Sequence, residues 1–270
     1  MEPDEINTLQ TASSIESDYS ASIAPVWHTL ALVAGIVAIS IEGAMRFSSH
    51  LGTTNRLVTY SHTAILELVL LAWVLLGVRL SKTSFRSLLG SFSWSLRSLA
   101  SDIGIAIVFW IASMTVLSTA SIAWSGVAAA VTHHTQMTEG GAQPSASKDQ
   151  LLRGLSLLAP TNPAEIVAWT LLCILAGFAE EVVFRGYLQH QFTAWARGGL
   201  VAGCVSSAVI FGAMHGYEGV RGMFLITVFG VLFSTLALLR RNLRAGMLAH
   251  GWHDLFVGLT LAFLKLHHQI

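Results

Sequence analysis

The feature that most constrains this chain of 270 residues is a set of long stretches without a charged side chain. No Asp, Glu, Lys or Arg interrupts residues 19–41, 103–138, 198–217 or 222–239. Because a helix of about 20 apolar residues crosses the hydrocarbon core of a bilayer, each of these stretches is long enough to span it. Charged residues make up only 11% of the chain, against roughly 25% in an average soluble domain, which excludes a soluble globular enzyme.

The apolar stretches predict an all-α fold, a polytopic membrane bundle of about seven transmembrane helices. The length of residues 103–131 leaves room for an eighth helix. We therefore expect an integral multi-pass protein, surrounded by the lipid bilayer of the cell membrane. The expected spans are residues 26–45, 57–79, 103–124, 164–186, 199–215, 222–239 and 245–264.

Polar residues divide the chain into four parts. Residues 1–25 hold five acids and no Lys or Arg, which predicts a disordered acidic tail rather than a cleaved signal peptide. Residues 26–131 contain the first three expected spans, and the polar stretch 132–162, rich in Gly, Ser and Pro, predicts a loop. Residues 163–266 then form a core of four helices.

Charge and cysteine content exclude other classes of protein. The 15 Lys and Arg residues balance 15 Asp and Glu, so no basic surface is available for nucleic acid. Cys173 and Cys204 lie alone in apolar stretches, which excludes a disulfide framework or a zinc knuckle. Eight Lys and Arg residues lie in loops on the same side of the membrane as the N-terminus, and six lie on the opposite side. Because Lys and Arg are more frequent in cytoplasmic loops, this favours a cytoplasmic N-terminus.

The C-terminal core places ionisable side chains inside three expected spans. Each such group costs roughly 2.5–3.5 kcal/mol on insertion scales, so it needs a partner or a function. The fourth span contains Glu180, Glu181 and Arg185, the fifth ends with Phe211 and His215, and the seventh begins with His250, His253 and Asp254.

Helical spacing assigns different roles to the two glutamates. Glu181 and Arg185 are four residues apart with the acid first, which predicts a structural ion pair. Glu180 is rotated by about 100° from its neighbour and can face a different wall of the bundle, without a fixed cation. It is therefore the better candidate for a general base. His250 and Asp254 share one helix face, whereas His253 is either a lesser participant or a packing residue.

The depths of these groups agree only if the fourth helix is long. Counted from the turn at residues 198–199, Glu180 and His215 lie within about 2 Å of one height at 1.5 Å per residue. Counted at the same 1.5 Å per residue from the turn before the seventh span, His250 would lie about 15 Å from that height. The difference disappears if residues 187–198 continue the fourth helix beyond the hydrocarbon. We therefore predict a long fourth helix.

Three motifs in this core resemble those of a protease family. They are E-E-x-x-x-R at Glu180, Glu181 and Arg185, F-x-x-x-H at Phe211 and His215, and H-x-x-x-D at His250 and Asp254. In order and spacing they resemble the CPBP family of intramembrane proteases, which includes the type II CAAX prenyl endopeptidases and the Abi proteins. The resemblance covers residues 164–264.

The resemblance implies hydrolysis of a peptide bond in a membrane-associated substrate, of CAAX type or another. Glu180 and His215 would hold and activate a water, while His250 and Asp254 would stabilise the oxyanion. The prenyl proteases typically carry Asn where this chain has Asp254. An ionised Asp cannot donate to an oxyanion, so Asp254 would have to be protonated or to orient His250.

Zinc-dependent hydrolysis and two non-proteolytic classes of protein stay open as alternatives. Glu180, His215, His250 and Asp254 are plausible zinc ligands, but the absence of H-E-x-x-H favours a metal-free glutamate mechanism without a cofactor. A proton-coupled transporter would also bury acids and histidines, although no repeated halves are visible. An immunity or scaffold protein of the same family is compatible with the sequence as well.

Several other residues carry simpler interpretations. Phe211 is a supporting residue that packs or lines the cavity. Glu42 and Glu67 lie in expected spans without a surrounding motif, so we expect a structural hydrogen bond or a tilted interface position for each. The pairs Gly199/Gly203 and Gly212/Gly216 should let the fifth span approach its neighbours closely.

Overall fold

The computed structural model describes residues 21–49, 55–91, 93–139 and 158–267. Within these ranges the chain is helical and forms no β-strand, which confirms the all-α prediction. The elements in chain order are α2 (Val26–Ser49), α3 (Arg56–Leu80), α4 (Phe85–Leu89), α5 (Leu96–Glu139), α7 (Pro163–Glu180), the π-helix η1 (Glu181–Leu188), α8 (Gln189–Trp195), α9 (Leu200–Met214), the 3₁₀ turn η2 (Gly216–Glu218), α10 (Gly219–Arg240) and α11 (Arg244–Leu266).

Six helical segments in the described ranges are long and apolar enough to cross a membrane, so the protein is an integral membrane protein. The expected span 199–215 is α9, which has only 15 residues. At 1.5 Å per residue it is about 22 Å long, shorter than a hydrocarbon core of about 30 Å. Residues 103–131 belong to the single helix α5, so no eighth span forms there.

The fourth helix is long, as predicted. Residues 163–195 form one continuous apolar helical segment made of α7, η1 and α8. Its middle part is a π-helix, a form found mostly as short insertions at functional sites and one that the sequence did not reveal. The Phe184 backbone carbonyl in this part accepts a hydrogen bond from the backbone N–H of Gln189. It accepts another, at 2.6 Å, from the Ser207 hydroxyl.

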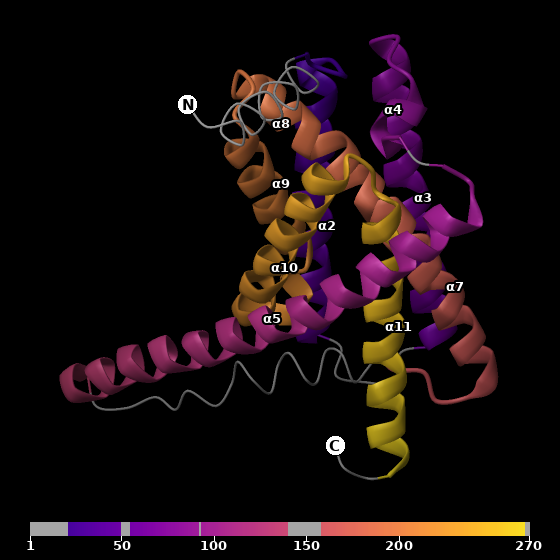
Figure 1. Ribbon diagram of the computed structural model, residues 1–270. Coiled ribbons are helices and arrows are strands. Elements are labelled where there is room, and N and C mark those ends of the chain that lie inside the picture. The colour runs from indigo at the N-terminus through magenta and orange to yellow at the C-terminus, as the bar shows by residue number, and fades with distance from the viewer. Residues whose placement is uncertain (1–20, 50–54, 92, 140–157, 268–270) are drawn as a thin grey trace, which may run out of the picture.

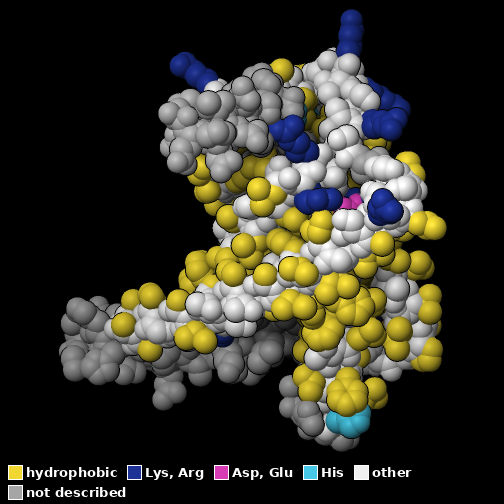
Figure 2. All heavy atoms as spheres, viewed as in Figure 1, with side chains coloured by type: hydrophobic (Ala, Val, Ile, Leu, Met, Phe, Trp, Pro, Cys, Tyr) yellow, Lys and Arg dark blue, Asp and Glu magenta, His cyan; other side chains and the backbone are white. Residues whose placement is uncertain are grey.

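The surface of the bundle is apolar and its interior holds polar groups. Val201 and Leu239 are each 77% exposed, whereas Glu181 and Gln189 are fully buried. Figure 2 shows apolar side chains over most of the visible face, with Lys and Arg gathered at the end where α4 and α8 lie. This distribution fits helices whose outer faces contact lipid.

Glycines bring α7 and α11 into backbone contact close to the polar residues. A Cβ on Gly177 would lie 2.7 Å from the Gly251 nitrogen and 2.9 Å from the Met247 carbonyl oxygen. On α9, Gly203 faces Gln189 and Gly212 faces Met223 at similarly short range, which confirms the predicted packing role of these glycines.

Helix α5 lies across α10 and α11, and its C-terminal part runs away from the bundle (Figure 1). It continues to Glu139, into the stretch expected to be a loop. The rest of that stretch up to residue 157, and residues 1–20 of the expected tail, lie outside the described residues.

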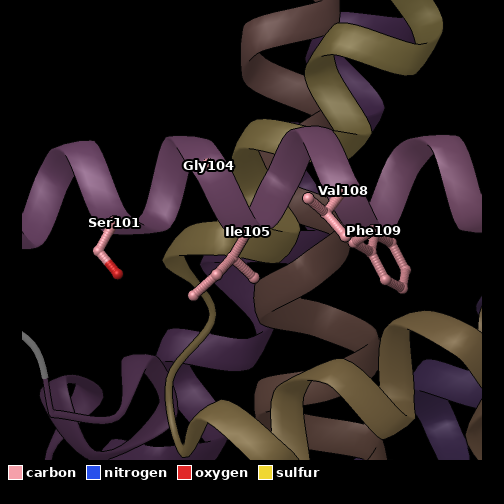
Figure 3. A pocket seen from close by; sticks show the side chains of 5 residues that line it. All are labelled: Ser101, Gly104, Ile105, Val108 and Phe109. Carbon is pink, nitrogen blue, oxygen red and sulfur yellow. The ribbon is translucent and has the colours of Figure 1, made fainter.

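A hollow of about 380 Å³ on α5 is lined by Ser101, Gly104, Ile105, Val108 and Phe109 and holds no titratable group (Figure 3).

Candidate active site

The structure brings the predicted polar residues of three segments together. Glu180 and Glu181 lie where α7 passes into η1, His215 ends α9, and His250 and Asp254 lie on the first turns of α11. The backbone contact between Gly177 and Gly251 sets the approach of α7 to α11, because each glycine lies within one turn of the polar residues on its helix.

The imidazole of His250 lies between the two glutamates. Its Nδ1 is 3.1 Å from Oε1 of Glu181, and its Nε2 is 3.4 Å from Oε2 of Glu180. The two carboxylates therefore do not face separate walls of the bundle, as the rotation between them had suggested. An imidazolium can donate at both nitrogens, so this arrangement suits a positively charged His250.

The predicted ion pair between Glu181 and Arg185 is confirmed. Nη1 of Arg185 is 3.1 Å from Oε1 of Glu181, and both side chains are 1% exposed. The guanidinium also lies 4.2 Å from the ring centroid of Phe211 and 5.0 Å from that of Phe233. Aromatic faces and one carboxylate thus compensate the buried cation.

The Phe211 ring is in contact with both His215 and His250. The ring centroids of Phe211 and His215 are 5.1 Å apart, and those of Phe211 and His250 are 5.9 Å apart. Nδ1 of His215 is 2.9 Å from the Phe211 carbonyl oxygen, which can only accept, so Nδ1 carries the proton. In the neutral ring Nε2 then keeps a lone pair that can accept a proton from water. The expected role of Phe211 as a wall is consistent with this position.

Asp254 lies near His250 but does not bond to it. Its Oδ2 is 3.8 Å from Nε2 of His250, and its side chain is 29% exposed. The Trp169 indole holds this part of α11 by donating to the Asp254 backbone carbonyl at 3.3 Å. Asp254 therefore acts on His250 through its charge and position rather than through a hydrogen bond.

Residues 162–256 match the family model of the Rce1-like type II CAAX prenyl endopeptidases. The chain carries a CPBP-family domain. A search of curated proteins gave no match, nor did a search of solved structures. The CPBP domain extends from the start of α7 into α11 and includes all seven predicted site residues, while α2, α3 and α5 lie outside it.

The structure adds three residues that the motifs did not indicate. Glu67 of α3 is 3% exposed, and its carboxyl group is within hydrogen-bonding reach of Glu180. Tyr217 and Glu218 follow His215 and interact electrostatically with Glu180. Burial of an acid in an expected span was the only sequence signal for Glu67, and nothing in the sequence indicated which helix it would meet.

His253 packs beside the site, and Glu42 lies at the surface of the bundle. Nδ1 of His253 accepts a hydrogen bond from the Trp110 indole at 3.3 Å, and its ring packs on Phe229. Of the alternatives open for His253, the structure favours the packing residue. Glu42 is exposed on α2.

The arrangement of these side chains does not fit a bound zinc ion. Within the described ranges, no three His, Cys, Asp or Glu side chains converge in a geometry that could hold one metal ion. A zinc site needs three or four such ligands at about 2.0–2.3 Å. Both ring nitrogens of His250, a candidate ligand, already face carboxylates.

Proposed function

We propose that the protein is an intramembrane endopeptidase that hydrolyses a peptide bond of a membrane-associated substrate, of the CAAX type, with Glu180 as general base. The observation that carries the proposal is the buried Oε2 of Glu180, which makes no hydrogen bond in the described part of the chain and lies beside His250 within the CPBP domain. A buried acceptor that makes no hydrogen bond is costly in a folded protein, so this oxygen suits a group that binds a reactant.

The first step is attack by water. Glu180 takes a proton from the water as its oxygen forms a bond to the substrate carbonyl carbon, and Nε2 of His215 accepts the second hydrogen bond of the same water. When the tetrahedral intermediate collapses, the C–N bond breaks and Glu180 returns its proton to the leaving amine. The products are a carboxylic acid, which keeps the second proton of the water, and an amine, so protons and electrons balance without an external reagent.

His250 stabilises the negative charge that develops on the substrate oxygen. Its Nδ1 is held by Glu181, which leaves Nε2 as the donor that can turn from Glu180 toward the oxyanion. A positioned donor of this kind contributes about 10²–10³ in rate. Asp254 supports the positive charge of His250 at 3.8 Å.

We propose that the reaction uses no metal or other cofactor, a proposal supported by the described side chains, which do not converge on one ion. We expect full activity after prolonged dialysis against a strong chelator, and substoichiometric metal in elemental analysis of the purified protein. Stoichiometric zinc whose removal abolishes cleavage and whose return restores it would contradict the metal-free mechanism.

Cleavage of labelled peptides by the purified full-length protein tests the proposal. A panel of peptides in bilayers, each offered with and without a prenyl group on a cysteine near its C-terminus, identifies the substrate class. Glu180→Gln, His215→Ala and His250→Ala should each lower kcat by at least about 10²-fold while the protein stays folded.

Glu42→Gln is the matched control, because it removes a charge from α2 at an exposed position and should leave kcat unchanged. Wild-type activity in all three site variants would refute the proposal. Absence of cleavage by the wild-type protein over the whole panel would favour a non-proteolytic role.

A further inference from the structure

We propose that Glu67 of α3 is a positioning residue for Glu180, to which its carboxyl group donates a hydrogen bond. This inference rests on the proposed function, and it extends the site to a helix outside the CPBP domain.

The two carboxyl groups meet inside the bundle. Glu67 is 3% exposed and Glu180 is 7% exposed, and their side chains are within hydrogen-bonding reach of each other. Helix α3 packs along α7, so this contact lies in a helix interface and not at a mobile end. A hydrogen bond between two carboxyl groups requires one of them to carry a proton.

The surrounding charges place that proton on Glu67. The charged groups that act on Glu67 are Glu180 and Asp254, both of which are acids. Asp254 acts on Glu180 as well, but Glu180 in addition lies in the field of two cationic side chains, His250 and Arg185. Because a buried carboxylate surrounded by acids is strongly disfavoured, Glu67 is the donor and Glu180 the ionised acceptor.

This hydrogen bond fixes the reactive carboxylate. The buried Oε2 atoms of both glutamates make no hydrogen bond in the described ranges, and Oε2 of Glu180 is the oxygen that faces His250. The bond from Glu67 therefore restrains one side of the Glu180 carboxylate and leaves Oε2 directed toward the place of the water and the substrate. Misplacement of a reacting group by about 1 Å can cost roughly 10²-fold in rate.

Substitutions at Glu67 separate this role from a purely structural one. Glu67→Gln keeps a neutral hydrogen-bond donor of the same shape, so kcat should stay within about threefold of wild type. Glu67→Leu and Glu67→Ala remove the donor, so kcat should fall by about 10- to 100-fold with KM unchanged. Leucine also fills the apolar surroundings, so the thermal unfolding temperature of Glu67→Leu should not fall.

The results separate failure of this inference from failure of the proposed function. Wild-type kcat in Glu67→Leu or Glu67→Ala, loss of kcat in Glu67→Gln equal to that in Glu67→Leu, or a change confined to KM would overturn the positioning role. If Glu180→Gln is inactive while Glu67→Leu is fully active, only the inference about Glu67 fails. If Glu180→Gln itself cleaves at the wild-type rate, the proposed function fails.

Discussion

At the residue scale, His250 links the two glutamates of the first motif. Oε1 of Glu181 is 3.1 Å from Nδ1 of His250 and also 3.1 Å from Nη1 of Arg185. Arg185, Glu181 and His250 therefore form a row of buried charged groups. Each member neutralises its neighbour, which lets several ionisable groups share a low-dielectric interior. Changes at Glu181 should therefore affect both the stability of the protein and its activity.

The Glu181–Arg185 pair is expected to stabilise the fold. Arg185→Leu leaves the Glu181 carboxylate without its cation, so the free energy of unfolding should fall by about 3–5 kcal/mol. Chemical denaturation in detergent micelles measures this difference. The double variant Glu181→Leu/Arg185→Leu should recover part of the loss, because it leaves no single unpaired charge from this pair. Equal stability of Arg185→Leu and wild type would contradict the interpretation.

Asp254 should tolerate replacement by the amide that prenyl proteases typically carry. Its Oδ2 is 3.8 Å from His250, too far for a hydrogen bond, and Glu181 holds the ring independently. We expect Asp254→Asn to keep kcat within about threefold of wild type, as measured in the peptide assay. A loss as large as that of His250→Ala would mean that the charge of Asp254 is essential.

Residue spacing revealed part of this site and could not reveal the rest. The i, i+4 rule predicts the Glu181–Arg185 pair because both residues lie on one helix. The contacts of His250 with both glutamates, and of Glu67 with Glu180, depend on how separate helices are rotated against each other. One sequence carries no direct signal for that rotation.

At the scale of the elements, the contact between α7 and α11 determines how closely Glu180 and His250 approach. Gly177 and Gly251 let the two backbones touch, and the π-helix begins directly after Glu180. The wider turn of a π-helix changes the direction in which the following residues point. Glu180 and Glu181 themselves keep ordinary right-handed helical dihedrals, so it is the close approach of His250 on α11 that brings both carboxylates to one imidazole.

Gly177→Ala tests the role of this contact. The added Cβ would lie 2.7 Å from the Gly251 nitrogen, a backbone atom that cannot move alone, so the helices must separate. We expect kcat to fall by about tenfold or more, together with a lower unfolding temperature.

Gly104→Ala on α5 is the matched control for this experiment, since a Cβ there meets nothing within 4 Å. It should leave both kcat and the unfolding temperature unchanged. Equal behaviour of the two alanine variants would contradict the proposed role of the close approach.

Helix lengths were predictable to different degrees. The long fourth helix followed from the requirement that polar groups on three helices share one depth. The continuous helix α5 and the short helix α9 did not follow, because apolar composition defines where a helix can lie in lipid but not where it ends inside a bundle.

At the scale of the whole molecule, the CPBP domain is completed by the helices that precede it. Helix α3 brings Glu67 to the site, and α2 packs against α9 and η2. Lys and Arg gather at the end of the molecule where α4 and α8 lie (Figure 2). Because basic loops are retained on the cytoplasmic side, this end should face the cytoplasm.

Accessibility to a membrane-impermeant thiol reagent measures this orientation. Both native cysteines are buried, so single cysteines can be introduced at Thr161 and Arg241 on an otherwise wild-type chain. In intact cells we expect the reagent to label Thr161→Cys and to leave Arg241→Cys unlabelled until the cells are opened. The reverse pattern would place the basic end outside.

The most direct test of the central claim is the origin of the oxygen in the cleavage product. In water enriched with ¹⁸O, a single turnover of the wild-type protein should place one solvent oxygen in the new C-terminal carboxylate, and an equal amount of folded Glu180→Gln should form product at least about 10²-fold more slowly. Wild-type product without solvent oxygen, or cleavage by Glu180→Gln at the wild-type rate, would contradict hydrolysis by a water that Glu180 activates.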